Sequence, residues 1–156
     1  MTSSDFSGRT DVLLDRAAGI CRRRGAQLTE LRRRVLGLVL ESSRPMGAYE
    51  LLDQLRAGRK TAAPPTVYRA LDFLLEHGLI HKVEKLSAFV GCSHRCDGEH
   101  IEAHAAQFLI CKRCGRVAEL DDPEVGEALA RAAQRNGFAL SSATVEAEGV
   151  CAECAG

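Results

Sequence analysis

Two pairs of cysteines carry the clearest chemistry in this sequence. The stretch CKRC places thiols at positions 111 and 114, and the stretch CAEC places two more at positions 151 and 154. A C-x2-C turn directs both of its sulfurs to one side, so each pair supplies half of a tetrahedral coordination shell. Four thiolates leave no open position on the metal, which is typical of a structural site. We therefore predict one structural Zn²⁺ bound by Cys111, Cys114, Cys151 and Cys154.

A thiol redox enzyme is the alternative interpretation of these pairs. Thioredoxin-like chemistry needs a C-x2-C at the start of a helix that follows a strand in a βαβ unit, and neither pair has that setting. The sequence also shows no combination of nucleophile, base and oxyanion donors. We therefore expect that this protein is not an enzyme.

The compartment follows from the N-terminus and the apolar runs. The opening MTSSDFSGRTDV lacks the basic-then-apolar layout of a signal peptide. No apolar run approaches the ~20 residues of a membrane span. We expect a cytoplasmic protein with no membrane partner, in which seven cysteines favour metal binding over a disulfide framework.

A second group of metal ligands begins in the stretch LIHKVEKLSAFVGC, residues 79–92, which reads as a β-hairpin. Pairing Glu84 with Phe89 across a four-residue loop makes His81 and Cys92 face each other at the base of the hairpin. Imidazole and thiolate are both good Zn²⁺ ligands. The hairpin therefore predicts half of a second zinc site.

The second half of the chain offers the remaining ligands. His104 precedes the first strand expected there, and Glu119 lies in the partner strand. Nitrogen, sulfur, nitrogen and oxygen donors suit a four-coordinate Zn²⁺. We predict a second zinc site at His81, Cys92, His104 and Glu119. Between the two halves lie further potential ligands, which form either an auxiliary metal site or a solvated connector: His94, Cys96, Glu99, His100 and Glu102.

The apolar pattern of the first half positions the hairpin behind a run of helices. Periodicity predicts helices in residues 10–24, 28–42, 47–58 and 65–77, with Thr29 as an N-cap and Gly25 and Gly78 as stops. Helices followed by a hairpin are the layout of a winged helix-turn-helix. Residues 1–90 carry 15 Lys+Arg against 10 Asp+Glu, and this excess of positive charge suits a polyanionic partner.

The second half has a different organisation and the opposite charge. Residues 91–156 carry 6 Lys+Arg against 11 Asp+Glu. Two strands around CKRC, a helix that starts at Pro123 and a last strand before CAEC predict a small α+β domain whose thin core needs a metal. We expect an α+β protein with a winged-helix DNA-binding domain (1–90), a hinge (91–103) and a zinc-binding domain (104–156).

Four motifs taken together resemble the ferric uptake regulator family, over nearly the whole chain from about residue 10: LTELRRRVL, PPTVYRALDFLLEHGLIHKVE, HAAQFLICKRCG and CAEC. The resemblance is strongest to the zinc uptake regulator branch. The iron- and peroxide-sensing branches usually have a dense histidine–aspartate run before the first C-x2-C, and this chain reads HAAQF there. An iron- or peroxide-sensing repressor of the same family remains the alternative.

The resemblance implies a repressor of zinc-uptake genes that binds double-stranded operator DNA as a homodimer, loaded with two Zn²⁺ per chain and without a small-molecule substrate. It also implies that residues 104–156 form the dimerisation domain. Tyr68 and Arg69 match the family's recognition-helix pair, and arginine is a common bidentate partner of guanine. A zinc-storage module would leave the winged-helix pattern and the charge split unexplained. The expected DNA-binding residues are Lys60, Thr66, Tyr68, Arg69, Arg32, Arg33 and Lys82.

Overall fold

The computed structural model describes residues 5–58, 63–92 and 106–156. Its contacts divide the chain into two units, Met1–Asp97 and Gly98–Gly156. None of the helices in these described ranges is long and apolar enough to cross a membrane. The finer division into residues 1–90, 91–103 and 104–156 stays a prediction.

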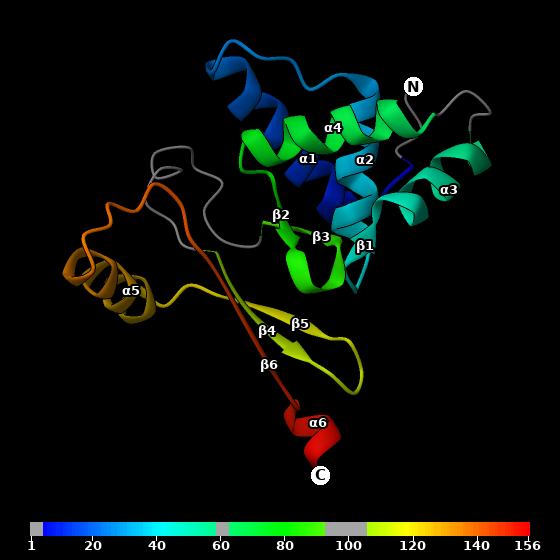
Figure 1. Ribbon diagram of the computed structural model, residues 1–156. Coiled ribbons are helices and arrows are strands. Elements are labelled where there is room, and N and C mark those ends of the chain that lie inside the picture. The colour runs from blue at the N-terminus through cyan, green and yellow to red at the C-terminus, as the bar shows by residue number, and fades with distance from the viewer. Residues whose placement is uncertain (1–4, 59–62, 93–105) are drawn as a thin grey trace. The chain divides into compact units, whose positions relative to one another are not determined.

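The first unit packs its helices around a core of leucine and valine. The described helices are α1 (Gly8–Arg23), α2 (Glu30–Glu41), α3 (Ala48–Gly58) and α4 (Pro64–Glu76) (Figure 1). Thr29 caps α2 by accepting a hydrogen bond from the Arg32 N–H, as predicted. Gly25 and Gly78 have φ values of +70° and +68°, so both act as the predicted left-handed stops. The largest fully buried side chains of these helices are Leu14, Val35, Leu36, Leu51, Val67, Leu71 and Leu74.

Two helices begin earlier than the sequence predicted. Ser7 caps α1 through its hydroxyl, which places the first helical residue at Gly8. Glu41 at the end of α2 accepts hydrogen bonds from the Ser7 N–H (2.8 Å) and hydroxyl (2.6 Å). Helix α4 begins at Pro64, because proline is favoured in the first turn, where no N–H is needed.

The wing of this unit is a three-stranded sheet in the order β1-β3-β2. Strands β2 (Ile80–Val83) and β3 (Ala88–Gly91) form the predicted antiparallel hairpin. Strand β1 (Met46–Gly47) pairs with the other edge of β3 and was not predicted, since two residues are too few to show an alternating pattern. Helices, turn and wing together confirm the winged helix-turn-helix.

The register of the hairpin differs from the predicted one. Val83 pairs with Ala88 and His81 pairs with Val90, so the predicted pairing of Glu84 with Phe89 and of His81 with Cys92 is wrong. The cause is the connection, in which a 3₁₀ turn over Glu84–Leu86 is followed by Ser87 at a left-handed φ of 47°.

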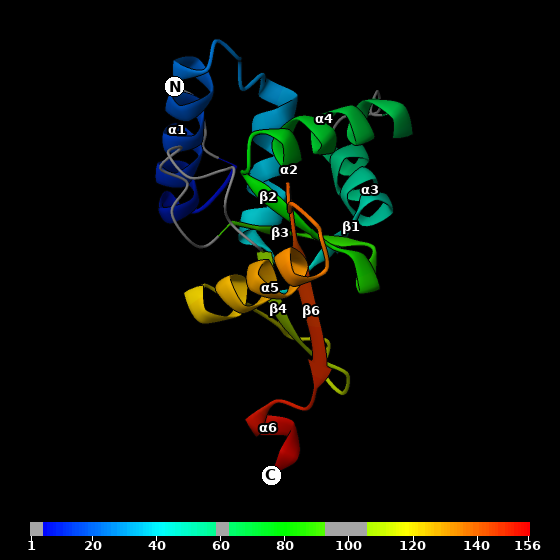
Figure 2. The same cartoon turned by 60° about the vertical axis from the view of Figure 1, so that its left-hand side comes forward.

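The second unit is a small sheet with two helices. Its described strands are β4 (Ala106–Cys111), β5 (Val117–Leu120) and β6 (Thr144–Gly149), in the order β5-β4-β6. Strand β5 is antiparallel to β4 and β6 is parallel to it. Helix α5 (Pro123–Arg135) connects β5 to β6 along the chain, and the short helix α6 (Ala152–Ala155) follows the C-terminal end of β6 (Figure 2). Asp122 caps α5 and Pro123 is its first residue, as predicted, whereas α6 was not predicted.

Little of this second unit is internally buried. Phe108 and Ile110 of β4 are buried, but no residue of α5 is. Phe138 is 69% exposed and Leu140 is 46% exposed, just after that helix. Because burial of apolar surface is the main stabilising term in folding, this unit needs another source of stability.

Candidate metal centres and nucleic-acid interface

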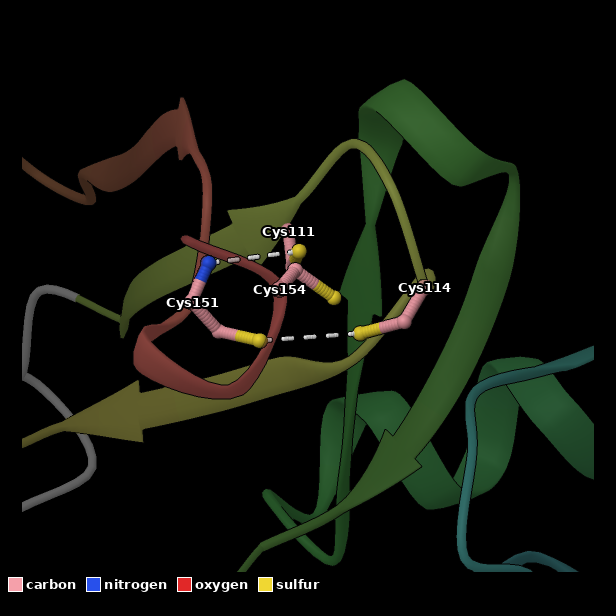
Figure 3. A group of neighbouring side chains, drawn as sticks. All are labelled: Cys111, Cys114, Cys151 and Cys154. Atoms are coloured by element: carbon pink, nitrogen blue, oxygen red, sulfur yellow. Dashed lines mark hydrogen bonds between the residues drawn. The ribbon is translucent and has the colours of Figure 1, made fainter. Parts of the chain in front are cut away.

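The four paired cysteines come together in the second unit. Cys111 ends β4, Cys114 closes the turn to β5, and Cys151 and Cys154 lie at the start of α6 and within it. Figure 3 shows the four sulfurs pointing towards one another. All four lie within 4.8 Å of each other. The structure therefore gathers the predicted structural ligands at one place.

The spacing of the sulfurs suits a tetrahedral metal. Zn–S bonds of about 2.3 Å in a tetrahedron place two sulfurs about 3.8 Å apart. The Cys114 and Cys151 sulfurs are 3.8 Å apart. A set of four thiolates accommodates Zn²⁺ and leaves no position for a substrate.

The backbone around these thiols is arranged to bind negative charge. The Cys151 N–H donates to the Cys111 sulfur over 3.3 Å (Figure 3). Hydrogen bonds from the backbone N–H groups of Cys151, Cys114 and Arg113 lower the pKa of Cys111 to about 6. Hydrogen bonds with Cys151 and Cys114 raise the pKa of Cys154 to about 12. These hydrogen bonds thus favour the thiolate of Cys111 and the protonated thiol of Cys154. Four adjacent thiolates would repel one another, so they need a cation to compensate their charge.

Two arginines of the CKRCGR stretch hold the second cysteine pair beside the first. Arg113 donates to the carbonyl oxygen of Cys154, and Arg116 donates to the Glu153 carboxylate over 2.8 Å. Gly115, at φ +74°, lies in the connection between the two arginines. These outer contacts orient the ligands, which is the usual task of residues around a metal centre.

The second predicted site is only partly described. Within the first unit, one ligand atom of His81 and the Cys92 sulfur lie within 4.8 Å of each other. They are diagonal neighbours, since His81 pairs with Val90 and the Cys92 N–H donates to the Leu79 carbonyl over 3.2 Å. The register shift of two residues keeps both side chains on the same face of the wing, because facing alternates with a period of two.

The other predicted ligands belong to the second unit. Glu119 lies in β5, where it pairs with Phe108 of β4. His104 lies outside the described residues, as do the auxiliary candidates His94, Cys96, Glu99, His100 and Glu102. The four-ligand regulatory site therefore stays a prediction.

The predicted DNA-reading residues lie on the outer face of α4. Thr66, Tyr68 and Arg69 are exposed, and Tyr68 is exposed by 45%. The opposite face of α4 buries Val67 and Leu71 in the core. Helix α4 is thus fixed by its apolar side and presents the polar side to solvent, as a recognition helix requires.

Of the remaining predicted DNA-binding residues, three contact other residues of the chain and one is not described, and their contacts with DNA stay predictions. Arg33 pairs with Asp15 at 2.8 Å, and Lys82 pairs with Glu84 at 3.3 Å. Lys60 lies outside the described residues. Arg32 lies over the ring of Phe73, 3.7 Å from its centroid. Sequence reasoning missed this stacking, because Arg32 and Phe73 are brought together only by the packing of α2 against α4.

Comparisons with known proteins agree with this fold. The sequence profile of the ferric uptake regulator family matches residues 23–148. The zinc uptake regulation protein of Escherichia coli (strain K12) is 43% identical over 145 residues, which are 93% of this chain and 82% of that protein. The zinc uptake regulation protein of Mycobacterium tuberculosis (strain ATCC 25618 / H37Rv) is 37% identical, over 69% of this chain and 78% of that protein.

A solved structure extends the likeness to three dimensions. A zinc uptake regulator complexed with zinc and DNA is 42% identical and superposes with a TM-score of 0.87, covering 96% of this chain and 97% of its own. The matching profile, the relatives and the solved structure all point to one group of proteins. This chain belongs to the ferric uptake regulator family.

Proposed function

We propose that this chain is a zinc-responsive transcriptional repressor that binds operator DNA as a homodimer and controls zinc-uptake genes. One observation carries the proposal. The unit that presents Tyr68 and Arg69 on α4 also holds His81 and Cys92 close together on its wing. Metal binding and DNA reading are thereby combined in one folded unit, which is the requirement for a metal to control DNA affinity. Similarity to zinc uptake regulators supports the same conclusion.

The proposal assigns two zinc ions to each chain. The first is structural and is held by the four cysteines of the second unit. The second is regulatory and is held by His81, Cys92, His104 and Glu119. The thiolate of Cys92 favours Zn²⁺ over the metals that prefer nitrogen and oxygen ligands alone. Zinc lacks redox chemistry, so the regulatory ion acts through coordination geometry.

Regulation then follows from a shift of population. A metal whose ligands come from both units restricts their freedom relative to each other. The recognition helices of a dimer must match DNA half-sites about 34–36 Å apart, or a multiple of this distance. Zinc binds the competent arrangement more tightly and increases its share of the ensemble. Repression occurs when zinc is plentiful.

The second unit supports the homodimer. Helix α5 has no buried residue, and its partly exposed apolar side includes Val125, Leu129 and Ala132. Phe138 and Leu140 add exposed apolar surface in the same unit. A second copy of the chain covers such a surface with matching chemistry.

The test combines metal analysis with DNA binding. The purified protein is assayed for zinc per chain and for binding to a duplex enriched by the protein from a random-sequence pool. We expect about two zinc ions per chain and tight binding only when both sites are filled. Fe²⁺ and Mn²⁺ are tested in parallel, because an iron- or manganese-dependent complex would assign the protein to another branch. Failure to enrich any sequence at saturating zinc would refute the repressor function.

A further inference from the structure

The C-terminal end of the recognition helix is held by arginines from outside the helix. Helix α4 has no basic residue in its last turn, although a helix C-terminus favours positive charge. Arg24, which follows α1, donates from Nη1 to the carbonyl oxygen of His77, over 2.9 Å. His77 is the C-cap of α4. Arg24 thus binds the last carbonyl at the negative end of the helix.

Arg32 contacts the same end of α4 by stacking on the ring of Phe73. Its guanidinium carbon lies 3.7 Å from the centroid of the Phe73 ring, and its Nη1 donates to the Gln27 carbonyl over 2.8 Å. The centroid of the His77 ring lies 4.3 Å from that of the Phe73 ring, one turn further along the chain. Arg32 therefore joins the start of α2 to a pair of rings on α4. Arg32 and Phe73 are half-buried, so water screens this contact less than a fully exposed one.

The Phe73 ring follows the predicted DNA-reading residue Arg69 by one turn of α4. Arg69 and Phe73 are four residues apart, so they occupy the same side of α4 on successive turns. Long side chains in helices lean towards the N-terminus, which directs Phe73 over the turn that carries Arg69. Whatever fixes Phe73 also limits the directions that Arg69 and α4 can take.

We propose that Arg32 is a positioning residue for DNA recognition. Its stacking on Phe73, together with the bond from Arg24 to His77, fixes the orientation in which α4 presents Arg69. This assignment replaces the expected phosphate contact of Arg32, and it rests on the proposed DNA-binding function. The role belongs to the planar guanidinium and not to the positive charge alone.

The substitution Arg32→Lys separates the two roles. Lysine keeps the charge that a phosphate contact needs. It lacks the planar group that stacks on a ring while donating sideways to a carbonyl. A phosphate-binding residue tolerates this change, whereas a stacking residue does not. Arg44→Lys is the matched control, because Arg44 forms an exposed ion pair with Glu50 that lysine retains.

The assay measures binding of each variant to two duplexes at several salt concentrations. One is the duplex enriched from a random pool, and the other has the same composition in scrambled order. We expect Arg32→Lys to bind the enriched duplex about tenfold more weakly, with unchanged affinity for the scrambled duplex and an unchanged salt slope. Phe73→Leu should show a similar loss, and the double variant should lose little more than either single one. Arg44→Lys should bind as the unmodified protein does.

A second measurement tests, without DNA, the clamp formed by the contacts of Arg24 and Arg32 with the C-terminal end of α4. Amide hydrogen exchange in the last two turns of α4 should be faster in Arg32→Lys than in the unmodified protein. The proposal is overturned if amide hydrogen exchange in Arg32→Lys is unchanged, or if Arg32→Lys binds the enriched duplex as tightly as the unmodified protein does. Arg32→Gln that weakens binding to both duplexes and reduces the salt slope by about one also overturns it, in favour of a phosphate contact. Faster exchange in a protein that enriches no sequence would uphold the clamp and refute the DNA-binding function.

Discussion

Replacing Cys111 by serine should unfold the second unit, because the metal supplies more stability there than the packing does. Structural Zn²⁺ bound by small domains contributes about 10–16 kcal/mol of apparent binding free energy at pH 7. A whole domain is typically stable by only about 5–15 kcal/mol. The second unit buries Phe108 and Ile110 but nothing from α5. Serine removes one of four ligands and the sulfur that accepts the Cys151 N–H. The remaining packing cannot replace that contribution.

The control for this experiment is Cys21→Ser. Cys21 is fully buried in α1 of the first unit and belongs to neither metal cluster. Its substitution buries a hydroxyl at a cost of about 1–3 kcal/mol, which lowers the melting temperature without changing the zinc content.

The measurements are zinc per chain, circular dichroism and sedimentation velocity. The sequence has no tryptophan, so intrinsic tryptophan fluorescence gives no signal. We expect Cys111→Ser to lose about one zinc per chain, the helical signal of α5 and the dimer, while Cys21→Ser retains all three. A Cys111→Ser protein that remains a folded dimer with its full zinc content would refute the structural role of the four cysteines.

Three further predictions concern DNA, zinc and pH. Arg69→Ala should cost roughly 1–3 kcal/mol of specific binding and relax the preference at one base position, whereas Lys60→Ala should weaken binding to all sequences alike and lessen the salt dependence. Equal titrations of Arg69→Ala and the unmodified protein on specific and random duplexes would rule out the reading role of α4. Cys92→Ser should keep the dimer, lose about one zinc per chain and lose zinc-dependent operator binding, more severely than Glu119→Ala does, because thiolate is the strongest ligand in the set. Persistence of fully zinc-dependent binding in Cys92→Ser would remove these residues from the regulatory site. Hydrogen bonds from Ser7, then Thr10, lower the pKa of Glu41. A lowered pKa in the folded state stabilises the protein above the ordinary carboxyl pKa and ceases to do so as the pH falls through the lowered value. Thermal unfolding should therefore show Glu41→Gln less stable than the unmodified protein at pH 6, with the difference shrinking in acid; a difference independent of pH would contradict this reasoning.

Most of the helices and strands were predicted from local sequence patterns, because helix caps, helix stops and apolar periodicity each involve residues that are close together in the sequence. Thr29, Gly78 and Pro123 marked helix ends that the structure confirms. The hairpin register was wrong because the loop conformation depends on Ser87 adopting a left-handed φ, which is uncommon for serine. Strand β1 exists only through its pairing with β3, so a two-residue segment carried no signal of its own.

The candidate sites show the same division between local and distant information. C-x2-C spacing is local, so the four thiols were predicted as one group, and the structure brings their sulfurs together. The expected phosphate contact of Arg32 was drawn from charge in a single helix. Its stacking on Phe73 joins residues about forty positions apart, and only the packing of α2 on α4 reveals it. Residue types indicate what a side chain is able to do, whereas tertiary contacts show which neighbours it has in the folded chain.

The parallel pairing of β6 with β4 has a consequence for the order of events during synthesis. Cys111 and Cys114 leave the ribosome before α5 and β6, and Cys151 and Cys154 follow only after the strand that carries them to β4. Until then the four-cysteine site has only two of its ligands, which hold zinc less firmly than four. The first unit is able to fold during this interval from contacts that are already complete. We therefore expect the second unit to acquire its metal and its sheet in one late step. A shortage of zinc at that moment should leave a chain whose winged helix is folded and whose second unit is not.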